Sequence, residues 1–226
     1  MPARLSLAAL LGGLLACGGC SDGASPDRES IEARLGTKCF AVPNKYAGAL
    51  DAPPFLPGIV SRLGYTHMRL LFPGAELADA VPGYAPEATH EIVVGISVAT
   101  AIERSRSHHR ALNYDEDLWR GTGFYETRTI EPMPKTPYFR VYMTPRNWLL
   151  AAADPSVKDF DFSKADMLIA NCTIFESSAI PSCAVDVVAD DRGWVLEFRL
   201  REENVSHRQA VAQYILRKID SWQRPC

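Results

Sequence analysis

The stretch CAVDVVADDRGWVLEFRLR, residues 183–201, decides the fold class of this chain. In residues 183–189 and again in 194–201, every second side chain is apolar, and the positions between them are mostly small or polar, with Val188 and Val195 as exceptions. This period of two is typical of strands that are buried on one face only. Residues 190–193 between them form a turn sequence, with Gly193 where a positive φ is useful. The stretch therefore predicts an antiparallel hairpin with one buried and one solvent-exposed face.

The flanking segments extend this hairpin and then cover it. Residues 167–175, MLIANCTIF, are apolar and β-prone, so they predict a third strand of the same meander. Downstream, Ser206 and Gln209 match the capping box that begins a helix. The apolar face of this helix consists of Val211, Ile215, Ile219 and Trp222, and its wet side of Arg208, Gln213, Arg217 and Lys218. A helix that leaves an antiparallel meander packs on its apolar face, because both surfaces need cover.

Earlier parts of the chain also carry strand patterns. Further strands are predicted over residues 39–43, 65–72, 91–98 and 138–143. Short helices are expected over 27–35 and over 146–153, the second with Pro145 in its first turn. Strands follow strands without β-α-β alternation, so we expect an α+β fold, a mainly antiparallel sheet with the C-terminal amphipathic helix packed on it. Residues 38–153 and 160–226 are candidates for two sub-layers of this domain.

The N-terminal residues 1–16 have the layout of a secretory signal peptide. Arg4 precedes a run of small and apolar residues that is too short to span a bilayer as a stable helix. The run ends directly before Cys17, and this arrangement resembles the lipobox of bacterial lipoproteins, in which the cysteine is acylated and becomes the new N-terminus. Leu14 and Ala16 favour Cys17, while Cys20 is a second candidate. A plain secretory signal cut after residue 16 is the alternative.

Residues 17–30 are polar and contain glycine and proline, so they are expected to tether the anchor flexibly to the domain of residues 31–226. In many bacterial lipoproteins, an aspartate directly after the acylated cysteine marks retention at the inner membrane. That position holds Gly18, or Ser21 if Cys20 is acylated. The resemblance therefore implies a lipid anchor in the outer membrane, with the domain facing the periplasm.

The six cysteines are interpreted in that light, because disulfides form in the oxidising periplasm. If Cys17 carries the lipid, an odd number of cysteines remains; if Cys20 carries it, four remain and form two bridges. The sequence leaves the connectivity open. The favoured pairs are Cys172–Cys183, which is local, and Cys39–Cys226, which would join the two ends of the domain.

Two other interpretations of Cys172 and Cys183 fit the sequence less well. A redox-active pair is usually C-x-x-C at a helix N-terminus, whereas ten residues separate these cysteines between two strands. A zinc site would need two more ligands close by. A structural disulfide closing a loop of this length contributes about 2–3 kcal/mol to the free energy of unfolding.

Composition and motifs narrow the function. The formal net charge of −3 without a basic cluster argues against a nucleic-acid partner. The adjacent His108 and His109 point in different directions on a strand or a helix, so they make a poor metal pair. Ser177 and Ser178 have no histidine near them in sequence, and the chain lacks G-x-S-x-G, S-x-x-K and H-E-x-x-H motifs. The sequence therefore predicts a protein that is not an enzyme and has no metal or cofactor.

The connection over residues 103–137 is unusually long for a compact domain, and long loops are often functional. Its interleaved charges and aromatic residues suit contact with a protein, and the alternative is a solvated insertion. An acidic turn at 115–117 lacks the glycine and the distal glutamate of an EF-hand calcium loop. The candidate partner-binding residues are Asp115, Glu116, Asp117, Trp119 and Tyr125.

Three features together resemble periplasmic lipoprotein immunity proteins, which are encoded beside secreted antibacterial effectors such as those of type VI secretion. They are the lipobox, the C-x-x-x-P segment 39–43, and the terminal C…P-x-C meander, which is followed by an amphipathic helix ending in Trp222. The resemblance implies a protein that binds and blocks a toxic effector, and the acidic balance would suit a basic patch on that partner. The alternatives are an envelope assembly or scaffold lipoprotein and a periplasmic hydrolase with a dispersed site.

Overall fold

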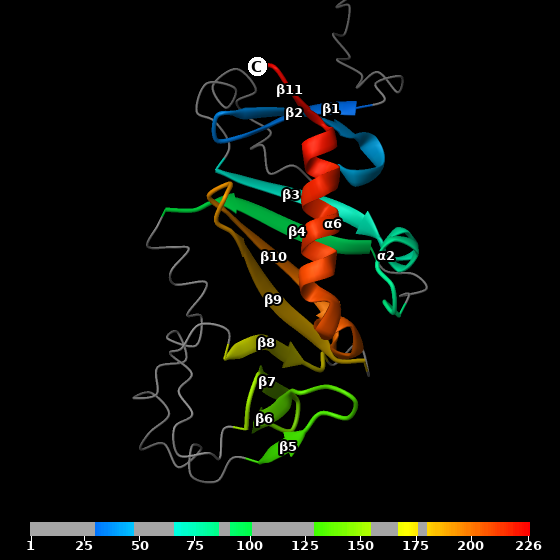
Figure 1. Ribbon diagram of the computed structural model, residues 1–226, viewed down its shortest axis with the longest axis vertical. Helices are drawn as coiled ribbons and strands as arrows, with labels where there is room; N and C mark the ends of the chain where they lie inside the picture. Colours follow the sequence, from blue (N-terminus) through cyan, green and yellow to red (C-terminus); the bar gives the residue numbers. More distant parts are fainter. Residues whose placement is uncertain (1–29, 48–65, 86–90, 101–128, 155–166, 176–179) are drawn as a thin grey trace, which may run out of the picture.

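The computed structural model describes residues 30–47, 66–85, 91–100, 129–154, 167–175 and 180–226. Within these ranges the chain forms an eight-stranded antiparallel sheet, a three-stranded sheet and a long C-terminal helix (Figure 1). The α+β fold expected from the sequence is therefore confirmed.

The large sheet contains strands from nearly the whole described chain. Its strands in spatial order are β3 (His67–Pro73), β4 (Glu91–Val98), β10 (Trp194–Arg201), β9 (Ser182–Ala189), β8 (Leu168–Thr173), β7 (Asn147–Ala151), β6 (Phe139–Thr144) and β5 (Ile130–Pro132). The predicted hairpin lies in its interior, where Phe198 is opposite Val185 and Gly193 adopts a φ of +66° in the turn. Strands from both 38–153 and 160–226 share this one sheet.

Helix α6 (Arg208–Ser221) covers one face of the large sheet. It crosses β3, β4, β10 and β9, with β5 to β8 beyond its N-terminal end (Figure 1). Its buried side chains include Val211, Ile215 and Ile219, as the apolar stripe predicted. These side chains join Leu196 and other residues of the sheet in one core cluster, and burying each large aliphatic side chain contributes about 1.5–3 kcal/mol.

The predicted capping box is wrong. The 3-10 helix η3 (Glu202–His207) runs directly into α6, whose N-cap residue is His207, and no side chain caps α6. The Arg208 N–H donates to the Val205 carbonyl. The preceding turns therefore supply an acceptor that the Ser206 hydroxyl would have provided at an isolated helix start.

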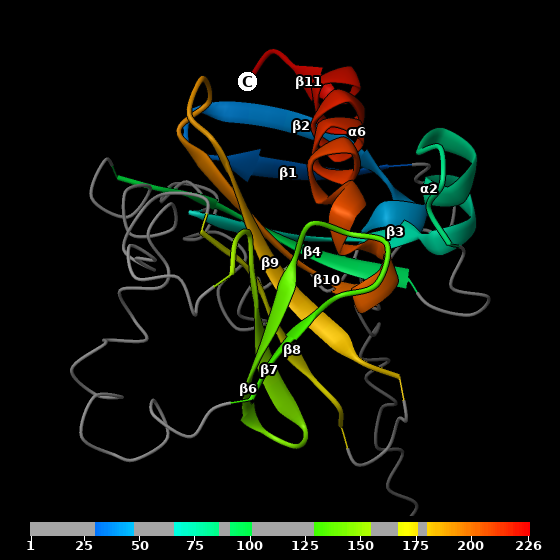
Figure 2. The same cartoon turned by 60° about the horizontal axis from the view of Figure 1, so that its bottom comes forward.

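The smaller sheet has the strand order β1-β2-β11, from β1 (Ser30–Leu35), β2 (Lys38–Pro43) and β11 (Gln223–Arg224). It lies at the C-terminal end of α6, as both views show (Figure 2). The Cys39–Cys226 disulfide joins β2 to the chain end, and the Ala41 N–H donates to the Trp222 carbonyl at 2.8 Å. The N-terminal and C-terminal segments of the described fold are therefore bound to each other.

Two expected helices are strands. Residues 27–35 were expected to be helical, but Ser30–Leu35 form β1, because all six of its residues pair with β2. Residues 146–153 were expected to be helical, but Asn147–Ala151 form β7 between β6 and β8. Four consecutive residues of β7 are buried, and a short apolar run of this kind fits a buried helix and a strand covered on both faces equally well.

Two short helices were not anticipated. The 3-10 helix η1 (Asn44–Tyr46) follows β2, and α2 (Gly74–Ala80) follows β3 directly after Pro73. Both carry buried side chains, Tyr46 and Leu77, that belong to the same core as α6.

Candidate functional site

A pocket of about 360 Å³ lies where β6, the end of β10 and the start of η3 come together. Strand β6, helix η3, the turn between β5 and β6, and the segment that leads into β9 all contribute to its walls. The residues that line it are Met133, Pro134, Arg140, Ile180, Pro181, Arg201, Glu202 and Glu203.

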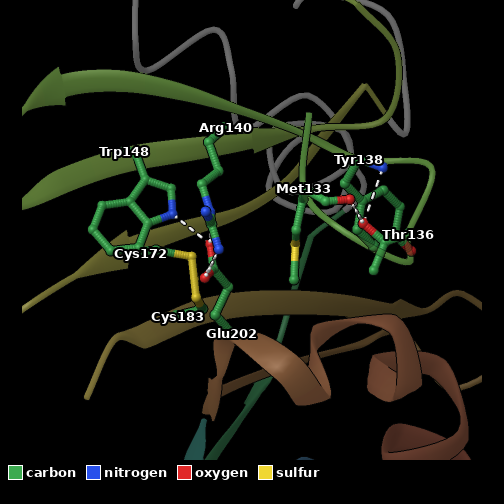
Figure 3. A network of polar contacts seen from close by, with 8 residues as sticks. All are labelled: Met133, Thr136, Tyr138, Arg140, Trp148, Cys172, Cys183 and Glu202. Atoms are coloured by element: carbon green, nitrogen blue, oxygen red, sulfur yellow. Dashed lines mark hydrogen bonds and ion pairs between the residues drawn. A yellow bond between two sulfur atoms is a disulfide. The ribbon is translucent and has the colours of Figure 1, made fainter. Parts of the chain in front are cut away.

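An ion pair between Arg140 and Glu202 lies at this pocket (Figure 3). Arg140 donates from Nε to Oε1 of Glu202 at 2.7 Å and from Nη2 to Oε2 at 2.6 Å. Trp148 on β7 donates from Nε1 to the same Oε1 at 2.8 Å. Glu202 is only 8% exposed, so its charge is held by a bidentate arginine and an indole N–H instead of by water. The hydrogen bond to Glu202 raises the pKa of Arg140, which keeps its charge fixed.

The Cys172–Cys183 disulfide lies next to this network (Figure 3). Its cysteines are directly opposite each other on β8 and β9, with Cα atoms 3.9 Å apart and no exposed surface. Cys172 also pairs with Trp148 on β7. On its other side Cys183 pairs with Leu200, two residues before Glu202. The disulfide therefore joins β8 and β9, which pair with β7, the strand that carries Trp148, and with β10, the strand that leads into Glu202.

The turn between β5 and β6 is held by its own hydrogen bonds and by α6. The Met133 carbonyl accepts from the Thr136 N–H at 3.3 Å and from the Thr136 hydroxyl at 3.2 Å. Lys135 has a positive φ of 63° in this turn. Arg208, at the start of α6, donates to the Tyr138 hydroxyl at 2.8 Å and lies over its ring. The pocket wall formed by Met133 is therefore tied to the helix.

The pocket combines an apolar rim with charges that pair among themselves. Ile180 is 46% exposed at the rim, and Arg201 lies 3.5 Å from Glu203. Arg140 and Glu202 form the second pair. The proline, methionine and isoleucine side chains give a ligand apolar surface to contact. The four charged residues of the lining form two arginine–glutamate pairs.

A second polar cluster surrounds Glu76 on α2. Its Oε1 accepts from the Tyr214 hydroxyl, from the Tyr46 hydroxyl at 2.5 Å and from Lys218 Nζ at 2.9 Å. Burial alone raises the pKa of Glu76, but the hydrogen bonds from Tyr214, Tyr46 and Lys218 outweigh it and lower the pKa to about 2. Burial and the hydrogen bond to Glu76 raise the pKa of Tyr214 to about 12. This cluster ties η1, α2 and α6 together and is a structural element of the fold.

The sequence predictions for functional residues divide into two groups. The structure contains the disulfides Cys172–Cys183 and Cys39–Cys226, the two pairs favoured from the sequence. The lipidation candidates and the partner-binding residues lie outside the described residues; they are Cys17, Cys20, Asp115, Glu116, Asp117, Trp119 and Tyr125. His108, His109, Ser177 and Ser178 lie outside them as well.

The sequence did not identify Arg140, Trp148 or Glu202 as site residues. The only signal was the position of Arg140 within an alternating strand, between the apolar residues Phe139 and Val141. That pattern placed Arg140 on the face opposite those two residues and so on a wet surface. In the structure its face of β6 is partly covered, because η3 places Glu202 against it.

The described part of the chain contains no group of three or more His, Cys, Asp or Glu side chains arranged to hold a metal ion. None of its helices is both long and apolar enough to cross a membrane.

Comparisons with known proteins gave one structural similarity. No protein-family model and no curated protein matched the chain. Among solved structures, an immunity protein of the Stenotrophomonas maltophilia type IV secretion system is similar with a TM-score of 0.44 and 12% sequence identity. The alignment covers 88% of this chain and 94% of that protein. A superposition this loose carries no functional information, so the function proposed next rests on the residues of this chain.

Proposed function

We propose that this chain is a protein-binding module of the bacterial envelope, and that it acts as a lipid-anchored immunity protein that neutralises a secreted antibacterial effector. The observation that carries the proposal is the pocket beside the Cys172–Cys183 disulfide, with Ile180 exposed at its rim. Protein interfaces concentrate their binding energy in a few well-packed apolar or aromatic anchors. A pocket with Ile180, Met133 and two prolines in its lining can receive such an anchor.

The polar groups of the pocket favour binding over catalysis. A general acid, a general base or a nucleophile needs a group that is available to exchange a proton or form a bond with substrate. Both oxygens of Glu202 already accept hydrogen bonds, from Arg140 and Trp148. Arg140 is a permanent cation whose pKa Glu202 raises further, so it does not serve as a general base. These residues therefore shape the pocket and keep its charges paired.

The location follows from the cysteines and the N-terminal sequence. Disulfides persist in oxidising compartments such as the periplasm, and this chain has two. The lipobox-like sequence before Cys17 would place the domain on a lipid anchor there. An effector that enters the periplasm would then meet the pocket side of an anchored binding domain.

The proposal is tested by protection against a toxin. If a gene for a secreted effector adjoins the gene for this chain, its product is directed to the periplasm of a test bacterium, with the chain present or absent, and growth is measured. We expect the chain to restore growth and Ile180→Asp to lose that protection. Val93→Asp is the matched control, because Val93 is 47% exposed but lies on β4, away from the pocket.

Three results would count against the proposal. Growth that stays inhibited with the wild-type chain present, although the chain accumulates in the periplasm, contradicts the immunity role. Loss of protection with Val93→Asp but not with Ile180→Asp would move the interface away from the pocket. Recovery of an envelope assembly component with the anchor-free chain, in place of the effector, would favour the scaffold function.

A further inference from the structure

We infer that the pocket takes a single uncharged side chain, preferably aromatic, that projects from the partner protein. This inference rests on the proposed function and names the chemistry of the partner at that site. The observation behind it is that the charges lining the pocket cancel in pairs, Arg140 with Glu202 and Arg201 with Glu203.

Because the charged residues of the lining are paired with each other, the pocket favours an uncharged side chain from the partner. A carboxylate or an ammonium group that entered the pocket would lose water, and it would compete with the existing pairs for a partner. The Arg140–Glu202 pair is the harder one to break, because Glu202 is nearly buried and is held by three donated hydrogen bonds. An uncharged side chain has no such cost.

The apolar walls decide the shape of the occupant. Pro134 and Pro181 are rigid, Met133 is adaptable, and Ile180 stands exposed at the rim. A pocket of about 360 Å³ has room for a large side chain such as tyrosine, phenylalanine or tryptophan.

Arg140 favours an aromatic ring over an aliphatic side chain. Its Nε and Nη2 are occupied by Glu202, yet its side chain remains 25% exposed at the pocket. Arginine stacks on aromatic rings, so an aromatic occupant would gain contact with the exposed part of Arg140 that an aliphatic occupant would not. The partner is therefore expected to contact this site through a protruding aromatic residue.

Small molecules that mimic side chains test this directly on the oxidised, anchor-free chain. The probes are p-cresol for tyrosine, indole for tryptophan, propionate for glutamate and n-butylammonium for lysine. Binding is followed by NMR through the Trp148 indole N–H, which donates to Glu202, and the Met133 methyl group. Trp148→Phe identifies the indole signal among the four tryptophans.

We expect p-cresol and indole to shift both signals in a saturable way, at millimolar concentrations, with affinities at least tenfold higher than those of propionate and n-butylammonium. Ile180→Asp should weaken p-cresol at least fivefold and strengthen n-butylammonium, because it removes an apolar wall and leaves one negative charge unpaired. Val93→Asp should leave all four affinities unchanged.

Equal or stronger binding of a charged probe, or no saturable shift with either aromatic probe, would overturn the inference. Failure here can be separated from failure of the proposed function. If growth protection by the chain persists while the aromatic probes do not bind, only the pocket chemistry is wrong. If the probes bind but no effector is neutralised, the pocket chemistry stands and the immunity role falls.

Discussion

Arg140 and Glu202 lie 62 residues apart in the sequence, yet their side chains meet through two hydrogen bonds of 2.7 and 2.6 Å. The pair joins β6, near one edge of the large sheet, to η3, the segment that leads into α6. It therefore fixes the end of the sheet against the start of the helix and forms part of the pocket at the same time.

Removing one partner of this pair should destabilise the protein more than removing both. Arg140→Met leaves the Glu202 carboxylate nearly buried without a counter-charge, and we expect a loss of about 2–3 kcal/mol in the free energy of unfolding. The double variant Arg140→Met, Glu202→Leu should recover most of this loss. Urea unfolding of the two single variants and the double variant measures the coupling. Losses that simply add would show that the pair contributes little.

The Glu76 cluster predicts an acid limit to stability. Because the folded-state pKa of Glu76 is about 2, below its usual value of 4.5, its contribution is fully present above about pH 4.5 and disappears as the pH falls toward 2. Glu76→Gln should lower stability by about 1–2 kcal/mol at neutral pH and flatten the pH dependence between 2 and 4.5. Thermal unfolding from pH 2 to 7 measures this. Asp79→Asn, at an exposed position of the same helix, is the control. It should leave the loss of thermal stability between pH 4.5 and 2 unchanged.

Breaking the buried disulfide should matter only in the oxidised protein. Cys172→Ser opens a loop with a sequence separation of 11, so we expect a loss of about 3 kcal/mol in oxidising buffer. After reduction the variant and the wild type should unfold at nearly the same temperature. An equal difference between them in both buffers would mean that packing of the cysteine, and not the bridge, stabilises the fold.

The terminal disulfide should contribute more than the buried one. The Cys39–Cys226 bridge closes a sequence separation of 187, for which the same chain-entropy relation gives about 5 kcal/mol. Cys226→Ser should therefore lower the urea midpoint further than Cys172→Ser. Cys226 is exposed whereas Cys172 and Cys183 are fully buried, so graded reductant should open the terminal bridge first. Mass spectrometry of alkylated thiols follows the order, and prior release of Cys172 would contradict it.

Sequence patterns were sufficient for elements whose burial is one-sided. Strand β9 alternates buried and less buried residues along its whole length, β10 does so from Leu196 onward, and α6 carries a clear apolar stripe, so each was recognisable locally. Strand β7 was misassigned because Trp148, Leu149 and Leu150 are all buried, which erases the period of two. Strand β1 was misassigned because its pairing with β2 decides its conformation over local preference.

The pocket could not be predicted from the sequence for a different reason. Arg140, Trp148 and Glu202 come from β6, β7 and η3, and no local spacing relates them. Only the order of the strands brings them together, and that order depends on long-range pairing, such as that of β10 with β4. The cysteines were the exception, because a chemical bond was expected from the compartment and so their proximity was expected too.

The Cys39–Cys226 bridge also determines how the protein would carry mechanical load. A pull between residue 30 and the C-terminus passes along β1 and the turn at Gly36 to Cys39, and then crosses directly to Cys226. The chain between the two cysteines bears no tension. Such a pull peels β1 from β2 and stops after residues 30–39 are extended, at roughly 35 Å. Tension between these two points would thus strain one hairpin, while the large sheet and the pocket stay intact.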